Sequence, residues 1–304
     1  MRKFGMSLLA LCLVLGVLSG NVVAKTTGSH VEMPKQRIFS DFNDFKLAVK
    51  QADEYQQRNV SKQNISKAND IEDLKDIMRK ASNERAKKKD LNALTQYILE
   101  HAEDAIIYNP NLNSVSTFSS NGDVSVYRPV IAYYSSSKRT QVVGTMVWDS
   151  TTHILDGNSR VGDVGGNDAL ALAFSNVSDK ALGGILSWGI FTYDRYGTES
   201  FVSYDATETV KSGSSWAVSF EGQDRIHKNK NNALDYTWNS AEIEVLFDSN
   251  FYNLTGVVNM TYAHTWDTTE LTGFSIASGD PPIVTYNFSK KTNAWKNTGK
   301  YGSY

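Results

Sequence analysis

Apolar and polar residues alternate one by one in several runs of the carboxy-terminal two-thirds of the chain, and this period constrains the fold most. The clearest runs cover residues 216–220, 234–238, 241–247 and 254–262. A period of two gives each strand one apolar and one polar face, which is typical of antiparallel sheets packed on a single core. We therefore predict a mainly β fold over residues 109–304, an antiparallel β-sandwich or flattened barrel of about ten strands.

Residues 25–108 instead show the spacings of three and four that predict amphipathic helices. We expect these helices to begin at Asp41, Asn69 and Asp90, because each side chain can cap a helix amino terminus. Their predicted buried faces hold Phe45, Val49 and Ala52; Ile71, Leu74, Met78 and Ala81; and Leu91, Leu94, Ile98, Ala102 and Ala105. A small α-helical segment therefore precedes the β domain and should pack against one end or one sheet of it.

Residues 1–24 have the pattern of a secretory signal peptide. Arg2 and Lys3 precede an apolar run over residues 6–18, and Val22 and Ala24 occupy the positions that signal peptidase reads. The run is shorter than the roughly 20 residues that span a bilayer, so we expect cleavage after Ala24 and no transmembrane span in the mature chain. The sole cysteine, Cys12, lies in this peptide. An exported chain without cysteine is more typical of bacteria than of animals, so we predict a secreted, extracellular bacterial protein.

The charge balance argues against nucleic acid as a partner. Residues 25–108 carry 15 Lys or Arg and 14 Asp or Glu, and residues 109–304 carry 14 and 19. Neither part has the strongly basic surface that binds a phosphate backbone. We therefore predict that the chain has no nucleic-acid partner.

Common catalytic and zinc-binding motifs are missing from the sequence. It has no Gly-x-Ser-x-Gly elbow and no His-Glu-x-x-His. His264 shares the parity of Met260 and Tyr262 and should point into the core at the end of a strand. We interpret it as a hydrogen-bonded core histidine, with a metal ligand or catalytic base as the alternative and His153 as a candidate partner.

Glu242 and Glu244 are two carboxylates that the strand pattern places on one face, roughly 7 Å apart. That separation fits the acid and base, or the acid and nucleophile, of a glycoside hydrolase. The run Glu242–Phe247 resembles the Glu-Ile-Asp-x-x-Glu strand of laminarinase-type glycoside hydrolases, but Phe247 replaces the second catalytic carboxylate of that family. We expect a polar sheet face turned to water and keep a glycoside hydrolase built on this pair as an alternative.

A glycine-rich loop brings together oxygen ligands of the kind that calcium prefers. The candidate ligands are Asp156, Asn158, Asp163 and Asp168. Calcium binds several hard oxygen atoms on flexible backbone, but the same residue types also form ordinary turns. We therefore predict no cofactor, with calcium as the candidate metal.

Aromatic side chains interleaved with polar ones mark the first half of the β segment. Trp188, Tyr193, Tyr196 and Tyr204 are the candidate binding residues, because flat rings bordered by polar groups stack sugars or anchor proteins. We predict a secreted, non-enzymatic binding or surface-associated protein that contacts a glycan, cell wall or protein partner. The alternatives are the glycoside hydrolase and a pore-forming or membrane-active protein with an insertable hairpin over residues 198–220.

Overall fold

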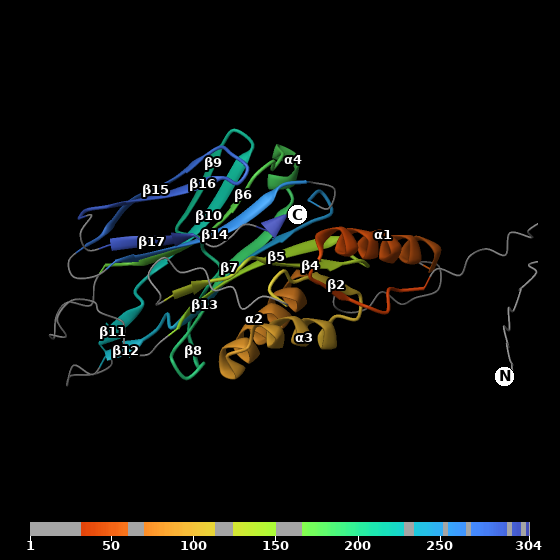
Figure 1. Cartoon of the computed structure of the whole chain (residues 1–304), viewed down its shortest axis with the longest axis horizontal. Coiled ribbons are helices and arrows are strands. Elements are labelled where there is room, and N and C mark those ends of the chain that lie inside the picture. Colours follow the sequence, from red (N-terminus) through yellow and green to blue (C-terminus); the bar gives the residue numbers. More distant parts are fainter. Residues whose placement is uncertain are drawn as a thin grey trace, which may run out of the picture. The chain divides into compact units, whose positions relative to one another are not determined.

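The computed structural model describes residues 32–59, 70–112, 124–149, 166–227, 234–251, 255–265, 269–290, 294–298 and 302–303. All of them belong to one compact unit, Glu32–Tyr304. The predicted mainly β fold, with antiparallel sheets and a small amino-terminal helical segment, is confirmed (Figure 1). The predicted signal peptide of residues 1–24 lies outside the described residues.

The larger sheet has eight strands in the order β1-β2-β4-β5-β13-β7-β8, with β3 paired to β5. The strands are β1 (Ile38–Phe39), β2 (Ala105–Tyr108), β3 (Val124–Val126), β4 (Val130–Tyr134), β5 (Arg139–Trp148), β7 (Ile185–Tyr193), β8 (Glu199–Ser203) and β13 (Ser240–Phe247). β1 runs parallel to β2, and β13 lies between β5 and β7, antiparallel to both. The predicted run 241–247 is therefore a central strand.

The smaller sheet has six strands in the order β17-β14-β6-β10-β9, with β18 paired to β14. They are β6 (Asp168–Phe174), β9 (Glu208–Ser212), β10 (Ser215–Gly222), β14 (Val257–Thr265), β17 (Ala294–Thr298) and β18 (Gly302–Ser303). Separate two-stranded sheets are formed by β11 (Arg225–His227) with β12 (Leu234–Tyr236), and by β15 (Leu271–Ala277) with β16 (Ile283–Phe288).

The chain changes sheets within residues 198–220, the segment that the pore-forming alternative treats as an insertable hairpin. β8 belongs to the larger sheet, whereas β9 and β10 pair with each other in the smaller one. The crossing lies between Ser203, where β8 ends, and Glu208, where β9 begins.

The two larger sheets share one apolar core. Ile243 of β13, Leu172 of β6 and Met260 of β14 all lie in it. The sheets approach so closely that a Cβ on Gly144 of β5 would lie 2.5 Å from Met260 Sδ. The alternation over residues 241–247 is confirmed on this side, since its apolar members all belong to this core.

Three of the four described helices form the predicted amino-terminal segment. The helices are α1 (Phe42–Asn59), α2 (Ile71–Lys88), α3 (Leu91–His101) and α4 (Asp179–Leu182). Asp41 and Asp90 cap α1 and α3 as predicted, but Asp70 caps α2 in place of Asn69. Ala105, expected on the third helix, lies instead in β2.

Helices cover both faces of the larger sheet. α1 packs on its sandwich side near β2, through Phe45 and Val49. α2 and α3 pack on the opposite side, where Leu74 and Ile98 meet Leu246 of β13 in a second apolar cluster (Figure 1). Strands β2, β4 and β13 of the larger sheet are therefore buried on both faces, unlike the one-sided strands that the sequence predicts.

Candidate functional site

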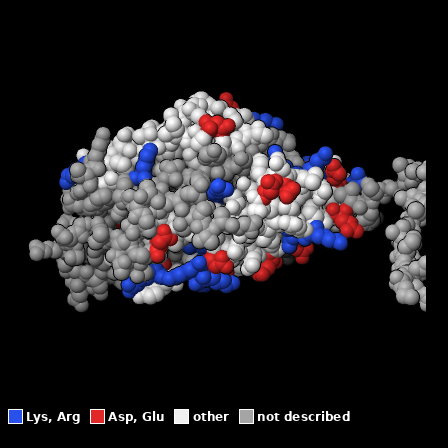
Figure 2. Space-filling view, viewed as in Figure 1, with Lys and Arg blue, Asp and Glu red and all other residues white. Residues whose placement is uncertain are grey.

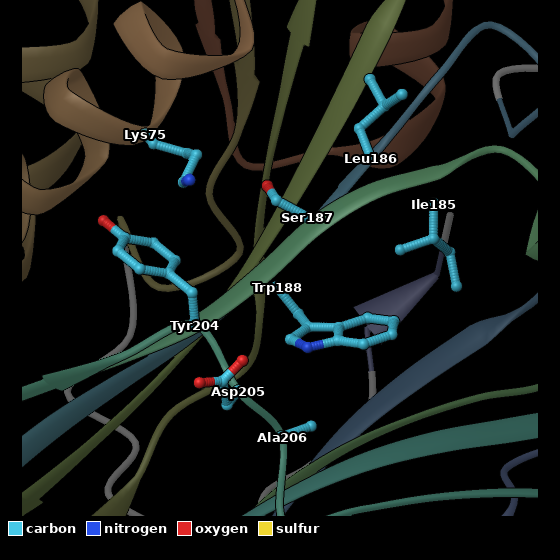
Figure 3. A pocket seen from close by; sticks show the side chains of 8 residues that line it. All are labelled: Lys75, Ile185, Leu186, Ser187, Trp188, Tyr204, Asp205 and Ala206. Atoms are coloured by element: carbon cyan, nitrogen blue, oxygen red, sulfur yellow. The ribbon is translucent and has the colours of Figure 1, made fainter.

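A pocket of about 460 Å³ opens at the start of β7 (Figure 3). β8 pairs with β7 only at Ile190–Tyr193, and the chain then turns away toward β9. Ile185–Trp188 therefore line the pocket on one side, and residues 204–206 line it on the other. Lys75 of α2 completes the lining. The pocket thus lies where the chain crosses between the sheets, beside the helix layer.

Two of the predicted binding residues, Trp188 and Tyr204, belong to this lining, and both are partly exposed. Trp188 packs on Trp216 at the rim of the sandwich core, with 6.3 Å between the ring centroids. The Tyr204 ring lies over Gly189, where a Cβ would be 3.0 Å from Tyr204 Cδ1. Glycine at position 189 therefore makes room for this ring, in the way that an aromatic residue covers a strand glycine in other sheets.

Lys75 and Tyr204 form the polar side of the pocket. Lys75 Nζ lies 4.2 Å from the centroid of the Tyr204 ring, a cation–π contact visible in Figure 3. Burial, with the nearby Glu244 carboxyl as the second cause, raises the pKa of Tyr204 to about 12. The phenol therefore keeps its proton at neutral pH and can donate a hydrogen bond.

Two smaller side chains, Ser187 and Asp205, are the remaining polar residues of the pocket lining. Ser187 Oγ is buried and has no hydrogen-bond partner among the residues that the structure describes. Asp205 is exposed at the opposite wall and supplies a carboxylate acceptor. The lining thus combines aromatic planes with hydrogen-bond donors and an acceptor.

The other two predicted aromatic residues lie elsewhere. Tyr193 is fully buried, and its hydroxyl donates to the Arg79 carbonyl oxygen of α2 at 3.4 Å. Tyr196 lies in the turn between β7 and β8, where it is 67% exposed and its ring centroid is 4.7 Å from the Arg195 guanidinium carbon. Neither of them lines the pocket.

The expectation that Glu242 and Glu244 face water is wrong. They do share one face of β13, as predicted, but both are 0% exposed because that face is covered by the helix layer. Glu242 forms an ion pair with Arg85 of α2, which also donates to Ser240 Oγ at 3.0 Å. Glu244 Oε2 accepts from Gln141 Nε2 at 2.5 Å. The two carboxylates therefore belong to buried contacts of β13.

Burial raises the pKa of both carboxyls. The pKa of Glu242 reaches about 7, although the Arg85 guanidinium acts to lower it. The pKa of Glu244 reaches about 8, with the hydrogen bond from Gln141 as the main opposing effect. Because neither carboxyl lines the pocket, the arrangement gives the predicted glycoside hydrolase pair no access to a substrate there.

His264 lies in the core at the end of β14, 3% exposed, as predicted. Its Nδ1 atom is 3.0 Å from Oδ2 of Asp168, the first residue of β6. The same carboxylate accepts from the Tyr262 hydroxyl and, at 2.9 Å, from the Thr265 backbone N–H. Burial raises the pKa of Asp168, while its contact with His264 acts to lower it. His264 therefore lies in the core with its ring nitrogen against a buried carboxylate.

The candidate calcium ligands are only partly described. Asp168 is 0% exposed and turned toward His264. Asp156, Asn158 and Asp163 lie outside the described residues, and so does His153, the candidate partner of His264. The calcium site therefore stays a prediction.

Comparisons with known proteins give little similarity. No protein-family model and no curated protein matches the chain. One similar solved structure is AvmM, which catalyses macrocyclization in alchivemycin A biosynthesis; it is 8% identical, with a TM-score of 0.25, over 55% of this chain and 88% of that one. Another is a DUF4466 family protein from Parabacteroides merdae, 6% identical, with a TM-score of 0.20, over 57% of this chain and 47% of that one. At these TM-scores neither similarity carries an argument.

The sequence patterns did not predict Lys75, Asp205 and Arg85 as site residues. Lys75 and Asp205 lie far apart in the chain, and nothing local marks them as members of one pocket. Arg85 did carry a signal, since it lies four residues after Ala81 on the buried stripe of α2. A charged residue in an apolar stripe predicts a buried partner of opposite charge.

The described surface shows no segregation of charge in the view of Figure 2, where basic and acidic side chains are interspersed.

None of the helices in the described ranges is long and apolar enough to cross a membrane.

Proposed function

We propose that this chain is a secreted, non-enzymatic binding protein that takes a glycan in the pocket at the start of β7. The observation that carries the proposal is the lining of the pocket. It combines the aromatic rings of Trp188 and Tyr204 with hydrogen-bond donors and a hydrogen-bond acceptor. A sugar ring presents apolar C–H faces, which stack on aromatic rings, and hydroxyl groups, which both donate and accept hydrogen bonds.

The size and chemistry of the pocket support this proposal. About 460 Å³ lies within the roughly 300–1,000 Å³ of typical small-ligand sites. Lys75 and Tyr204 can donate to sugar oxygens, and Asp205 can accept from a hydroxyl. A second carboxylate, as glycoside hydrolysis requires, is not found among the described residues that line the pocket. The chain would therefore hold a glycan without cleaving it.

Binding is tested with an oligosaccharide panel and insoluble cellulose, chitin and peptidoglycan, by retention and then by isothermal titration calorimetry. We expect Trp188→Ala and Tyr204→Ala each to weaken binding by about tenfold or more, the loss typical of a buried aromatic contact. Tyr196→Ala is the matched control, since this exposed ring lies outside the pocket, and it should bind as tightly as the wild type. Binding to none of these sugars, or equal binding by all four proteins, would contradict the proposal.

Export is part of the same proposal and rests on the pattern of residues 1–24. We expect the protein recovered from culture medium to begin at Lys25, because cleavage is predicted after Ala24. Amino-terminal sequencing checks this. An intact leader on protein that stays inside the cell would contradict it.

A further inference from the structure

Three buried side chains converge at one end of the sandwich, away from the pocket lining. They are Asp168, Asp224 and His264, which are 0%, 1% and 3% exposed. One ligand atom from each lies within 4.8 Å of the others. His264 Nδ1 is 3.0 Å from Asp168 Oδ2 and 3.8 Å from Asp224 Oδ2. One imidazole nitrogen and two carboxylate groups therefore lie close enough together to bind one metal ion.

Strand pairing explains this convergence. β6 lies between β14 and β10, and Ala263 is opposite Ala169, so His264 lies beside Asp168. On the other side Gly222 is opposite Asp168, and Asp224 follows two residues later. The Asp224 carbonyl oxygen accepts from the Thr237 N–H at 2.7 Å, which fixes the backbone at this point. Three neighbouring chain segments therefore carry the three side chains on rigid backbone.

The separations match those of metal ligands. Ligand atoms about 2.0–2.2 Å from a tetrahedral zinc ion lie roughly 3.3–3.6 Å apart. The two distances from His264 Nδ1, 3.0 Å and 3.8 Å, lie on either side of this range. Imidazole nitrogen combined with carboxylate oxygen suits zinc and similar transition-metal ions, whereas calcium selects oxygen alone.

Other contacts already hold the ligands in place. The Tyr262 hydroxyl donates to Asp168 Oδ2, and the Thr265 N–H donates to Oδ1 at 2.9 Å. The Trp148 ring packs edge-on against the His264 ring, with 5.1 Å between centroids. Contacts of this kind orient the ligands in metal sites.

Burial favours a cation at this point. Asp168 and Asp224 bring two carboxyl groups into a region with almost no solvent contact, beside the imidazole of His264. A bound divalent ion supplies the positive partner that buried carboxylates require.

We propose that Asp168, Asp224 and His264 form a binding site for one divalent transition-metal ion, with Zn²⁺ as the probe. The site is separate from the proposed glycan pocket and does not depend on it. It differs from the predicted calcium site in using an imidazole ligand.

The test titrates Zn²⁺ into the purified full chain after treatment with a chelator, by calorimetry and thermal melting. We expect one ion per chain, a melting midpoint raised by several degrees at saturation, and binding weakened by about tenfold or more in Asp224→Asn and in His264→Gln. Asp76→Asn is the matched control, because this carboxylate on α2 is 57% exposed, and it should bind zinc as the wild type does.

A second measurement covers the case in which a core variant fails to fold. X-ray absorption at the zinc edge of the wild-type protein should show one imidazole nitrogen with oxygen ligands. Absence of zinc binding at 100-fold excess, a spectrum with several imidazoles, or unchanged binding in both folded variants would overturn the proposal.

Discussion

Replacing Arg85 with methionine is expected to lower the free energy of unfolding by about 3–5 kcal/mol at pH 8, the usual cost of removing one partner from a buried ion pair. Arg85 is 2% exposed and Glu242 is 0% exposed, so the variant leaves the carboxylate without its cation inside the protein. The Arg85 side chain also packs near the Tyr193 ring, with 5.6 Å between the guanidinium carbon and the ring centroid. Urea denaturation followed by circular dichroism measures the loss.

The loss from Arg85→Met should shrink at pH 5, because Glu242 can then hold a proton. The pKa of Glu242 is about 7 even beside Arg85, and removing the cation raises it further. Lys80→Met on the same helix is the matched control, since Lys80 and Asp76 are each 57% exposed and such pairs contribute about 0–1 kcal/mol.

A double variant separates charge from packing. Arg85→Met combined with Glu242→Leu removes both charges and should recover most of the stability, as in other buried pairs replaced by apolar residues. A double variant as unstable as Arg85→Met alone would show that the loss comes from packing, and would contradict this interpretation.

Replacing Glu244 with glutamine is expected to stabilise the protein by several kcal/mol at pH 9 and to leave it nearly unchanged at pH 5. The pKa of Glu244 is raised from its ordinary value of 4.5 to about 8 in the folded chain. The folded protein therefore binds this proton more tightly than the unfolded chain does. The resulting stability is fully present below pH 4.5 and is lost as the pH rises through 8, at about 1.4 kcal/mol per pKa unit.

Glutamine keeps the contact that Glu244 makes. A neutral side-chain oxygen at position 244 can still accept from Gln141 Nε2, which in wild type lies 2.5 Å from Glu244 Oε2. Unfolding free energies at intervals between pH 5 and pH 9 measure the effect. Glu100→Gln, an exposed change on α3, serves as the control. It should leave the pH dependence of the unfolding free energy unchanged. If the unfolding free energy had the same pH dependence in wild type and in Glu244→Gln, this would rule out a buried, protonated Glu244.

The alternation of apolar and polar residues predicted which side chains share a face of a strand. It did not predict what packs against that face. Period-two alternation correctly put Ile243 and Val245 together on the sandwich core. It also put Glu242 and Glu244 on one face. Because both side chains are charged, we expected that face to be exposed to solvent. The helix layer covers that face instead, and only tertiary packing decides this. Arg85 was the sequence signal for such a contact, because it interrupts the apolar stripe of α2.

The candidate site was predictable only in part, for the same reason. Aromatic content singled out Trp188 and Tyr204, but the same criterion chose the buried Tyr193. Lys75 of α2 contacts the ring of Tyr204, the residue that follows β8, and no local spacing encodes a contact between residues so far apart in the chain. Likewise, the parity of His264 predicted its burial, whereas its partner Asp168 comes from a strand 96 residues away in sequence.

The most direct test of the central claim, that the chain binds a glycan at the start of β7, is to map backbone amide shifts by NMR while titrating the best-binding oligosaccharide. We predict that the largest shifts fall at Ser187, Trp188 and Tyr204. Saturable binding that leaves these three signals in place, with shifts confined to the turn at Tyr196 or to another surface, would contradict the claim.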